Sequence, residues 1–304
     1  SALFSICFGQ KNMDKLRNCI FVAFLIIGAA TVVLNILAFL FIDPILIFLK
    51  TPSEIYDMMR SYVFIIFTGL CATFFYNFFA SLLRSIGNSF IPLVFLAISA
   101  VLNIVLDLLF VVKFNWSVEG AAIATVISQY VSGIGITFYT LVYFPELRVR
   151  KSDMYIRKNV ISELSQFSFL TCLQQSVMNF GILMVQGLVN SFGTAIMAAF
   201  AAGVKIDSFA YMPVQDFGNA FSTFIAQNFG AKKTERIQKG IKSAVITSAV
   251  FCIFISFVVF ILAKPLMLIF IDESETEIIS SGVHYLRIEG LFYIGIGILF
   301  LFYG

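Results

Sequence analysis

The sequence predicts an all-α polytopic membrane protein, and three observations lead to this prediction. Of the 304 residues, 60% are hydrophobic and only 12% are charged, whereas soluble domains carry about 25% charged residues. The apolar residues are gathered in stretches as long as a bilayer is thick. The basic residues are concentrated in alternate connections between these stretches. A soluble core has no room for this much apolar surface, so a soluble fold is excluded.

Eight segments meet the requirement of about 20 apolar residues for a helix that crosses the bilayer. The predicted spans are 19–41, 62–83, 91–112, 121–144, 160–192, 195–228, 241–270 and 283–303. The apolar residues 1–8 indicate the end of a ninth span. Several spans exceed the required length, so we expect tilted helices or helices that extend beyond the bilayer.

The connections between spans predict the orientation of the protein. Lys and Arg accumulate on the cytoplasmic side, because moving them across the membrane is costly. Fourteen of the 20 basic residues lie on one side: Lys11, Lys15, Arg17, Arg84, Arg148, Arg150, Lys151, Arg157, Lys158, Lys232, Lys233, Arg236, Lys239 and Lys242. The other side has Lys50, Lys113 and Lys264, while Arg60, Lys205 and Arg287 lie within or at the edge of spans. This assignment alternates correctly over all eight spans, so the 14-residue side is predicted to be cytoplasmic.

The sequence contains none of the motifs expected of an enzyme. It has no Ser/His/Asp, HExxH or clustered carboxylate arrangement and no P-loop, and its single histidine is His284. The five cysteines are scattered without metal-ligand spacing and are interpreted as buried thiols. We therefore expect no enzymatic activity, no metal and no cofactor. The net charge of +3 does not indicate a nucleic-acid partner.

Residues 1–49 align with residues 222–270 at a constant offset of 221. Phe8-Gly9 then matches Phe229-Gly230, Lys11 matches Lys232 and Pro44 matches Pro265. Six spans separate the two copies, and this even number gives both the same orientation. Parallel repeats of this kind build two-lobed secondary transporters. The predicted N-lobe is 1–150 (the end of helix 2 to helix 6), and the predicted C-lobe is 151–304 (helix 7 to helix 10). The rest of helix 2 and helices 1, 11 and 12 would complete an expected twelve.

Four short motifs resemble the MATE (multidrug and toxin extrusion) family, particularly its bacterial branch. They are FGQK at 8–11 with its partner AQNFGAK at 226–232, LRSIGNS at 83–89 before Pro92, NIVLD at 103–107 and GAAIAT at 120–125. The resemblance covers essentially the whole chain. It implies a monomeric, two-lobed antiporter in the cell membrane that exports amphipathic, often cationic compounds in exchange for protons or sodium by alternating access.

The coupling ion and the substrate class stay open at this point. Sodium-coupled family members often carry an acidic residue in the seventh helix, but residues 171–176 contain no carboxylate. A lipid-linked oligosaccharide flippase is the alternative function, because the same architecture serves it. Such flippases typically have a strongly cationic cavity, and only Lys205 and Arg287 are predicted to lie deep in the membrane here. A channel is a third and less favoured interpretation.

Polar residues inside a bilayer are costly and usually face a cavity or another helix. In segment 160–192, Thr171, Gln175 and Asn179 share a helix face, which is typical of a cavity lining or of interhelical hydrogen bonds. In segment 195–228, a stripe of mixed polarity favours contact with an amphipathic ligand, and it contains Lys205, Met212, Gln215 and Asn219. Pro213 interrupts the hydrogen-bond ladder of this segment, as a flexible point or a static kink.

Two carboxylates are candidates for coupling transport to a cation. Glu289 is the first candidate, because it lies half-way along its span in a stripe with Tyr285 and Tyr293. A structural pair with an arginine is the alternative. Asp207 is the second candidate, with Tyr211 on the same face, and its alternative role is to neutralise Lys205.

Four further positions are predicted to serve the structure. Asn103 and Asp107 share a helix face and are expected to tie helices together. Arg84 and Gly87 are expected to form a cytoplasmic turn, where glycine relieves backbone strain and arginine anchors the interface.

Overall fold

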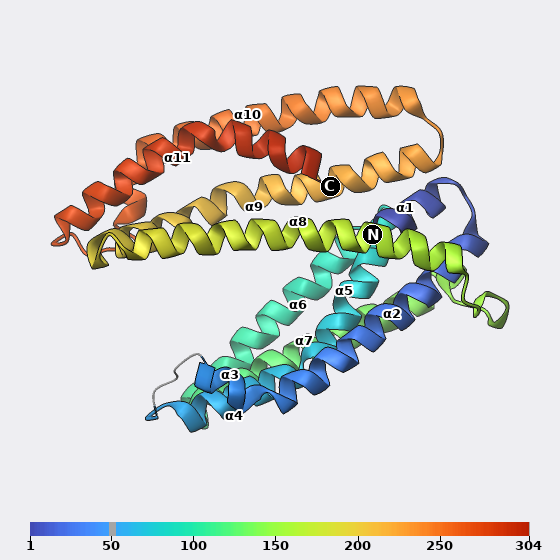
Figure 1. The fold of residues 1–304 in the computed structure, drawn as a ribbon, viewed down its shortest axis with the longest axis horizontal. Coiled ribbons are helices and arrows are strands. Elements are labelled where there is room, and N and C mark those ends of the chain that lie inside the picture. Colours follow the sequence, from blue (N-terminus) through green and yellow to red (C-terminus); the bar gives the residue numbers. More distant parts are fainter. Residues whose placement is uncertain (49–52, 304) are drawn as a thin grey trace. The chain divides into compact units, whose positions relative to one another are not determined.

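The computed structural model describes residues 1–48 and 53–303 of the chain. Lys50, which was counted on the outer side, and Gly304, the end of the predicted C-lobe, lie outside the described residues. The described chain is nearly all helical (Figure 1). Its α-helices are α1 Ala2–Gly9, α2 Met13–Leu40, α3 Ile42–Phe48, α4 Tyr56–Thr68, α5 Leu70–Ser85, α6 Phe90–Asp107, α7 Ser117–Tyr143, α8 Lys158–Asn190, α9 Thr194–Gly230, α10 Thr234–Met267 and α11 Thr276–Tyr303.

The eight predicted spans are confirmed, because eight helical segments of the described chain are long and apolar enough to cross a membrane. The second span, Tyr56–Ser85, is divided into α4 and α5 at Gly69. The N–H of Gly69 bonds to the carbonyl of Ile66 at 2.9 Å, which tightens the helix at this point. The third span ends in a π-helical turn, Leu108–Lys113.

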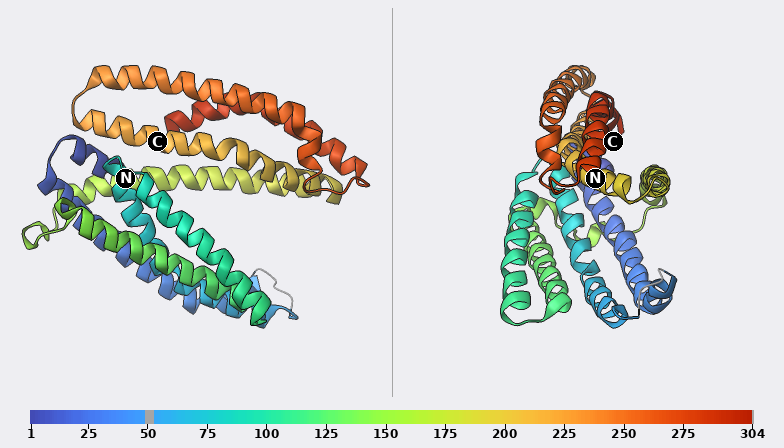
Figure 2. Two further views of the ribbon diagram at one scale, coloured as in Figure 1. Left: turned by 180° about the vertical axis from the view of Figure 1, so that it is seen from behind. Right: turned by 90° about the vertical axis from the view of Figure 1, so that its left-hand side faces the viewer.

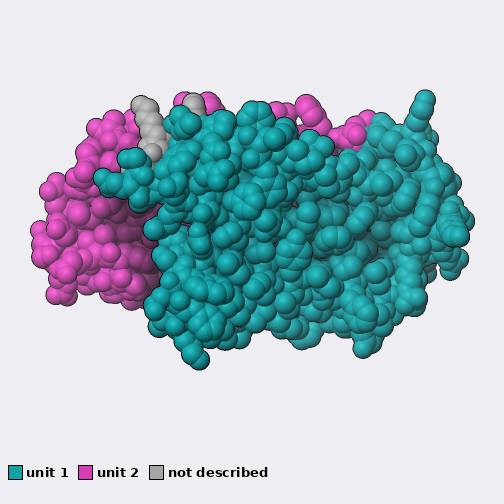
Figure 3. Space-filling model, turned by 90° about the horizontal axis from the view of Figure 1, so that it is seen from below, with its two compact units in different colours: residues 1–164 teal, residues 165–304 magenta. Residues whose placement is uncertain are grey.

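The chain divides into two compact units, Ser1–Leu164 and Ser165–Gly304 (Figure 3). The lobe boundary at residues 150 and 151 stays a prediction. In the first unit α7 packs against α4, α5 and α6. Gly133 of α7 permits a close approach to α5, because a methyl group there would lie 2.6 Å from the carbonyl oxygen of Ala72.

In the second unit α9, α10 and α11 pack against one another (Figure 2). Their shared core includes Val214 of α9, Cys252 and Met267 of α10, and Leu286 of α11. Beyond this core, exposed large apolar side chains cover much of the helices. Helices that face lipid are expected to have such surfaces, because a bilayer solvates apolar side chains and leaves the backbone polar groups to bond within the helix.

The aligned segments of the sequence have the same backbone turn. Lys11 and Lys232 both adopt a positive φ, of 57° and 56°. The N–H of Lys11 bonds to Phe8, and that of Lys232 to Phe229, at 2.9 and 3.0 Å. Each turn joins two helices, α1 to α2 in the first copy and α9 to α10 in the second. The offset of 221 found in the sequence therefore relates two equivalent helix connections.

Candidate functional site

The second unit contains a carboxylate buried between two membrane-spanning helices. Asp207 of α9 is only 5% exposed, and its Oδ1 accepts a hydrogen bond from the hydroxyl of Tyr293 in α11. The second carboxylate oxygen, Oδ2, is buried and has no hydrogen-bond partner among the described residues. A carboxylate at this depth is costly unless it binds a cation or a proton. The free oxygen provides a position for either.

Tyr285 and Glu289 of α11 lie near enough to Asp207 to interact with its charge. The ring of Tyr285 packs over Gly203, where a methyl group would lie 2.6 Å from it. Glycine one helical turn before Asp207 therefore leaves room for the tyrosine. The sequence predicted the stripe of Tyr285, Glu289 and Tyr293, but it could not reveal that this stripe faces Asp207.

The two basic residues that are predicted to lie deep in the membrane contact aromatic rings. The Nζ of Lys205 lies 5.8 Å from the centre of the Phe270 ring, and the guanidinium of Arg287 lies 5.2 Å from that of Phe260. Within the described part of the chain, neither residue forms an ion pair with Asp207 or Glu289. The alternative structural roles of these two carboxylates stay open.

The remaining residues of the α9 stripe differ in their surroundings. Tyr211 stacks on Phe300 at 6.2 Å between ring centres. Met212 and Asn219 are exposed, and Gln215 is half-buried. Helix α9 continues through Pro213 without a break. The proline ring is exposed. The role of Pro213 as a flexible point or a static kink stays a prediction.

The stripe predicted on α8 is exposed along its length. Thr171, Gln175 and Asn179 all lie on the surface, and the hydroxyl of Thr171 donates to the carbonyl of Phe167 at 2.9 Å. Their assignment to a substrate cavity stays a prediction.

Two structural roles inferred from the sequence agree with the contacts. The Nδ2 of Asn103 donates to the hydroxyl of Thr125 at 3.4 Å, which ties α6 to α7, while the buried Oδ1 of Asp107 has no partner in the described chain. At the end of α5, Gly87 has a φ of 91°, and the turn closes with a 2.9 Å bond from its N–H to the carbonyl of Arg84.

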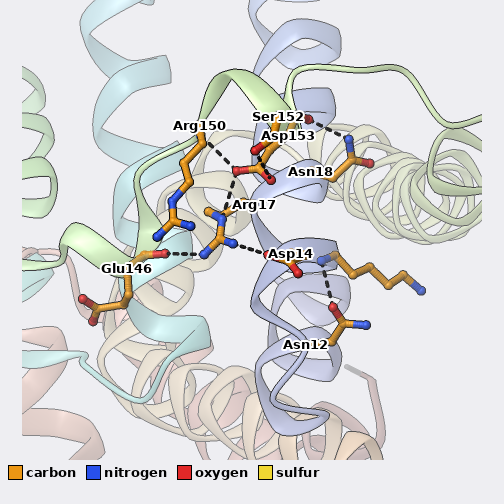
Figure 4. Close-up of polar contacts among 9 residues, drawn as sticks. Asn12, Asp14, Arg17, Asn18, Glu146, Arg150, Ser152 and Asp153 are labelled. Atoms are coloured by element: carbon orange, nitrogen blue, oxygen red, sulfur yellow. Dashed lines mark hydrogen bonds and ion pairs between the residues drawn. The ribbon is translucent and has the colours of Figure 1, made fainter.

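The first unit contains a buried polar cluster that the sequence did not reveal (Figure 4). Arg17 and Asp153 are 6% and 5% exposed, and Nε lies 2.9 Å from Oδ2. The Nδ2 of Asn18 donates to the carbonyls of Asp153 and Tyr155 at 2.8 and 2.7 Å. These hydrogen bonds and the ion pair hold residues 153–155, in the connection after α7, against the start of α2. The only signal in the sequence was an Arg-Asn pair at the edge of an apolar span.

Membrane-spanning helices in two units and a repeated helix connection define an all-α multi-pass membrane protein. A comparison with family models matches residues 1–109 and 168–304 to the MatE family. The chain belongs to the MatE family and is a multi-pass protein of the cell membrane. The resemblance seen in the sequence is thus confirmed.

Relatives of known name support the same assignment. The probable multidrug resistance protein YpnP of Bacillus subtilis is 28% identical over 84% of this chain and 57% of its own length. The probable multidrug resistance protein NorM of Thermotoga maritima is 27% identical over 81% of this chain and 53% of its own length. The chain thus spans just over half the length of these two relatives.

A solved structure of the same fold is the Vibrio cholerae MATE transporter VcmN in its bent form. The match covers 99% of this chain and 68% of that chain, with a TM-score of 0.89 and 25% identity. This agreement confirms the predicted fold class.

Proposed function

We propose that the protein exports small amphipathic, often cationic compounds across the cell membrane in exchange for protons or sodium. The names of its relatives, which are probable multidrug resistance proteins, support export of such compounds. The observation that carries the coupling part of the proposal is the buried carboxylate of Asp207, with one oxygen bonded to Tyr293 and the other free.

In this mechanism Asp207 binds the coupling ion at Oδ2, and Glu289 supplies a second acidic group nearby. Because Tyr293 comes from α11 and Asp207 from α9, the occupancy of the carboxylate affects the contact between these helices. A proton neutralises the carboxylate and weakens the hydrogen bond it accepts, whereas sodium leaves it ionised. Either event changes the relative stability of two arrangements of α9 and α11, which is what alternating access requires.

The substrate is proposed to contact the stripe on α9 that contains Met212 and Gln215. An unbranched thioether adapts to ligands of different shape. The amide of Gln215 supplies both a donor and an acceptor. A surface of this kind suits a range of amphipathic compounds better than one fixed ligand.

The test is efflux of the cationic dye ethidium from vesicles that contain the full gene product, under an imposed proton or sodium gradient. Asp207→Asn and Glu289→Gln are compared with two matched controls at the exposed ends of spans, Asp57→Asn in the first turn of α4 and Glu277→Gln in that of α11. We expect gradient-driven efflux to fall at least tenfold in Asp207→Asn and to persist in both controls. The gradient that drives efflux in the unchanged protein identifies the coupling ion.

Two results would count against the proposal. Efflux that is unchanged in both Asp207→Asn and Glu289→Gln would remove these carboxylates from the coupling mechanism. If the dye does not move under either gradient, the proposal that the protein exports cationic compounds is wrong. The names of the relatives do not support the flippase alternative. Lys205 and Arg287, the two basic residues predicted to lie deep enough for a cationic cavity, contact aromatic rings.

A further inference from the structure

The two copies of the repeated helix connection have the same backbone turn but use their basic residues differently. In the first copy the Nζ of Lys15 lies 3.0 Å from Glu163, and Arg17 pairs with Asp153 at 2.9 Å. Asn12 caps α2 by accepting a hydrogen bond from the N–H of Lys15 at 2.9 Å. The charges that follow this turn are therefore neutralised within the protein.

The second copy has five basic residues in eleven positions and one acidic residue, Glu235. The five are Lys232, Lys233, Arg236, Lys239 and Lys242, and all are exposed. None of them forms an ion pair with another described residue. The position that corresponds to the capping Asn12 is Lys233, which provides no side-chain cap. From Lys233 onward the basic residues recur every three positions, so that successive like charges are neighbours and repel one another.

These side chains lie at the level where lipid head groups are expected. They cover the first turns of α10, and the apolar part of this membrane-spanning helix follows directly. Phe229, at the turn itself, is 66% exposed, whereas its counterpart Phe8 packs against the core of the first unit. Aromatic and basic side chains at the end of a span are typical of contact with the cytoplasmic membrane interface.

We infer that Phe229 and the five basic residues 232–242 form a binding surface for acidic phospholipid head groups of the cytoplasmic leaflet. The phosphates neutralise charges that the protein leaves unpaired, and the exposed phenyl ring contacts the acyl boundary. A cluster of four to eight basic residues directly beside a span is the pattern that attracts acidic lipids, and this attraction weakens as salt is added. The first copy is not expected to bind in this way, because Lys15 and Arg17 are already paired and Lys11 is the one basic residue of this copy without an ion pair among the described residues.

The experiment measures binding of fluorescent phosphatidylglycerol and fluorescent phosphatidylcholine to the purified full chain in neutral detergent. One variant combines Lys233→Gln, Arg236→Gln and Lys239→Gln. The matched control combines Lys11→Gln, Lys151→Gln and Lys158→Gln, which removes the same number of exposed charges from the same predicted side of the membrane. Thermal unfolding verifies that both variants are folded.

We expect the unchanged protein to prefer phosphatidylglycerol over phosphatidylcholine by at least fivefold, and this preference to decrease with salt. The first variant is expected to lose the preference, while the control keeps it within twofold. An equal loss in both variants, or no preference in the unchanged protein, would overturn the inference. Displacement of the lipid by inorganic phosphate at the same concentration would also overturn it, by indicating a site for small anions.

Discussion

At the scale of single residues, the buried charges have two kinds of partner. Arg17 and Asp153 neutralise each other inside the first unit and are surrounded by further hydrogen bonds. Asp207 has a neutral partner, Tyr293, and no cation beside it within the described residues. A fully paired charge is suited to a fixed structural role, whereas a carboxylate without a counter-ion is suited to binding an exchangeable one.

The hydroxyl of Tyr293 is expected to stabilise the ionised form of Asp207. Tyr293→Phe keeps the buried ring but removes the donor, and we expect a loss of about 1 to 3 kcal/mol in the free energy of unfolding. Unfolding in mixed detergent micelles measures this loss. Tyr143→Phe is the control, because Tyr143 is 66% exposed and its replacement should cost little. A similar cost for both variants would show that the hydrogen bond does not stabilise the protein.

Stability at low pH is expected to depend on Asp43 of α3. The Arg60 guanidinium, 2.7 Å away, holds the pKa of Asp43 below its ordinary value, with a further hydrogen bond from Tyr56. A carboxyl group whose pKa is lowered by folding stabilises the protein above about pH 4, its pKa when unfolded, and loses this contribution as the pH falls through the folded value. The melting temperatures of the unchanged protein and Asp43→Asn should therefore differ slightly at pH 7 and converge in acid. A difference that grows with acidity would contradict this assignment.

At the scale of helices, glycines set how closely α9 and α11 approach at the buried carboxylate. A methyl group at Gly218 would lie 2.4 Å from the carbonyl oxygen of Phe300, and one at Gly203 would meet the ring of Tyr285. On α8, by contrast, a methyl group at Gly187 would meet no other atom within 4 Å. The same substitution therefore has opposite consequences on these helices.

We expect Gly218→Ala to destabilise the protein by about 1 to 3 kcal/mol, because the added methyl group separates α9 from α11. Gly187→Ala should stabilise it by up to about 1 kcal/mol, because alanine is the better helix former and meets no obstacle there. Thermal unfolding of the two variants side by side measures both effects. Stabilisation by Gly218→Ala would show that the helices can move apart without cost.

The connection after α7 is held on α2 by Arg17, and this attachment is expected to contribute strongly to stability. Arg17→Gln leaves the buried Asp153 without its counter-charge, which costs about 3 to 5 kcal/mol. The control is Lys15→Gln, which breaks a pair whose side chains are 27% and 39% exposed and should cost at most about 1 kcal/mol. Chemical unfolding measures both changes. Equal costs would contradict the role given to the buried cluster.

At the scale of the whole molecule, the orientation in the membrane follows from the distribution of charge. The basic residues 232–242 and the acidic run 272–277 lie at opposite ends of α10. The side with most Lys and Arg is predicted to be cytoplasmic. Residues at the two ends of α10 should therefore be accessible from different compartments.

Cysteine labelling tests this orientation. The sequence interpretation of all five cysteines as buried thiols is wrong for Cys172, which is exposed. In a Cys172→Ser background, Lys239→Cys should react with an impermeant maleimide only after the membrane is opened. Glu273→Cys should react in intact cells, and the background without an added cysteine is the control. Labelling of Lys239→Cys in intact cells would reverse the predicted topology.

The eight spans, the repeated connection and the family resemblance were predictable from the amino-acid sequence alone. Long apolar segments have few alternatives in a bilayer, because their backbone polar groups must bond within a helix. The glycine turn at Gly87 was also predictable, since its positive φ strongly favours glycine.

Only the tertiary structure decided which helix faces meet. Helical periodicity placed Tyr293 in a stripe and Asp207 on a face, but it could not bring together two residues 86 positions apart. It likewise gave no indication that Arg17 pairs with Asp153, 136 positions away, because Arg17 carried only the signal of a cytoplasmic charge. Periodicity fixes the direction of a side chain around its own helix, whereas its partner depends on how helices distant in sequence pack together.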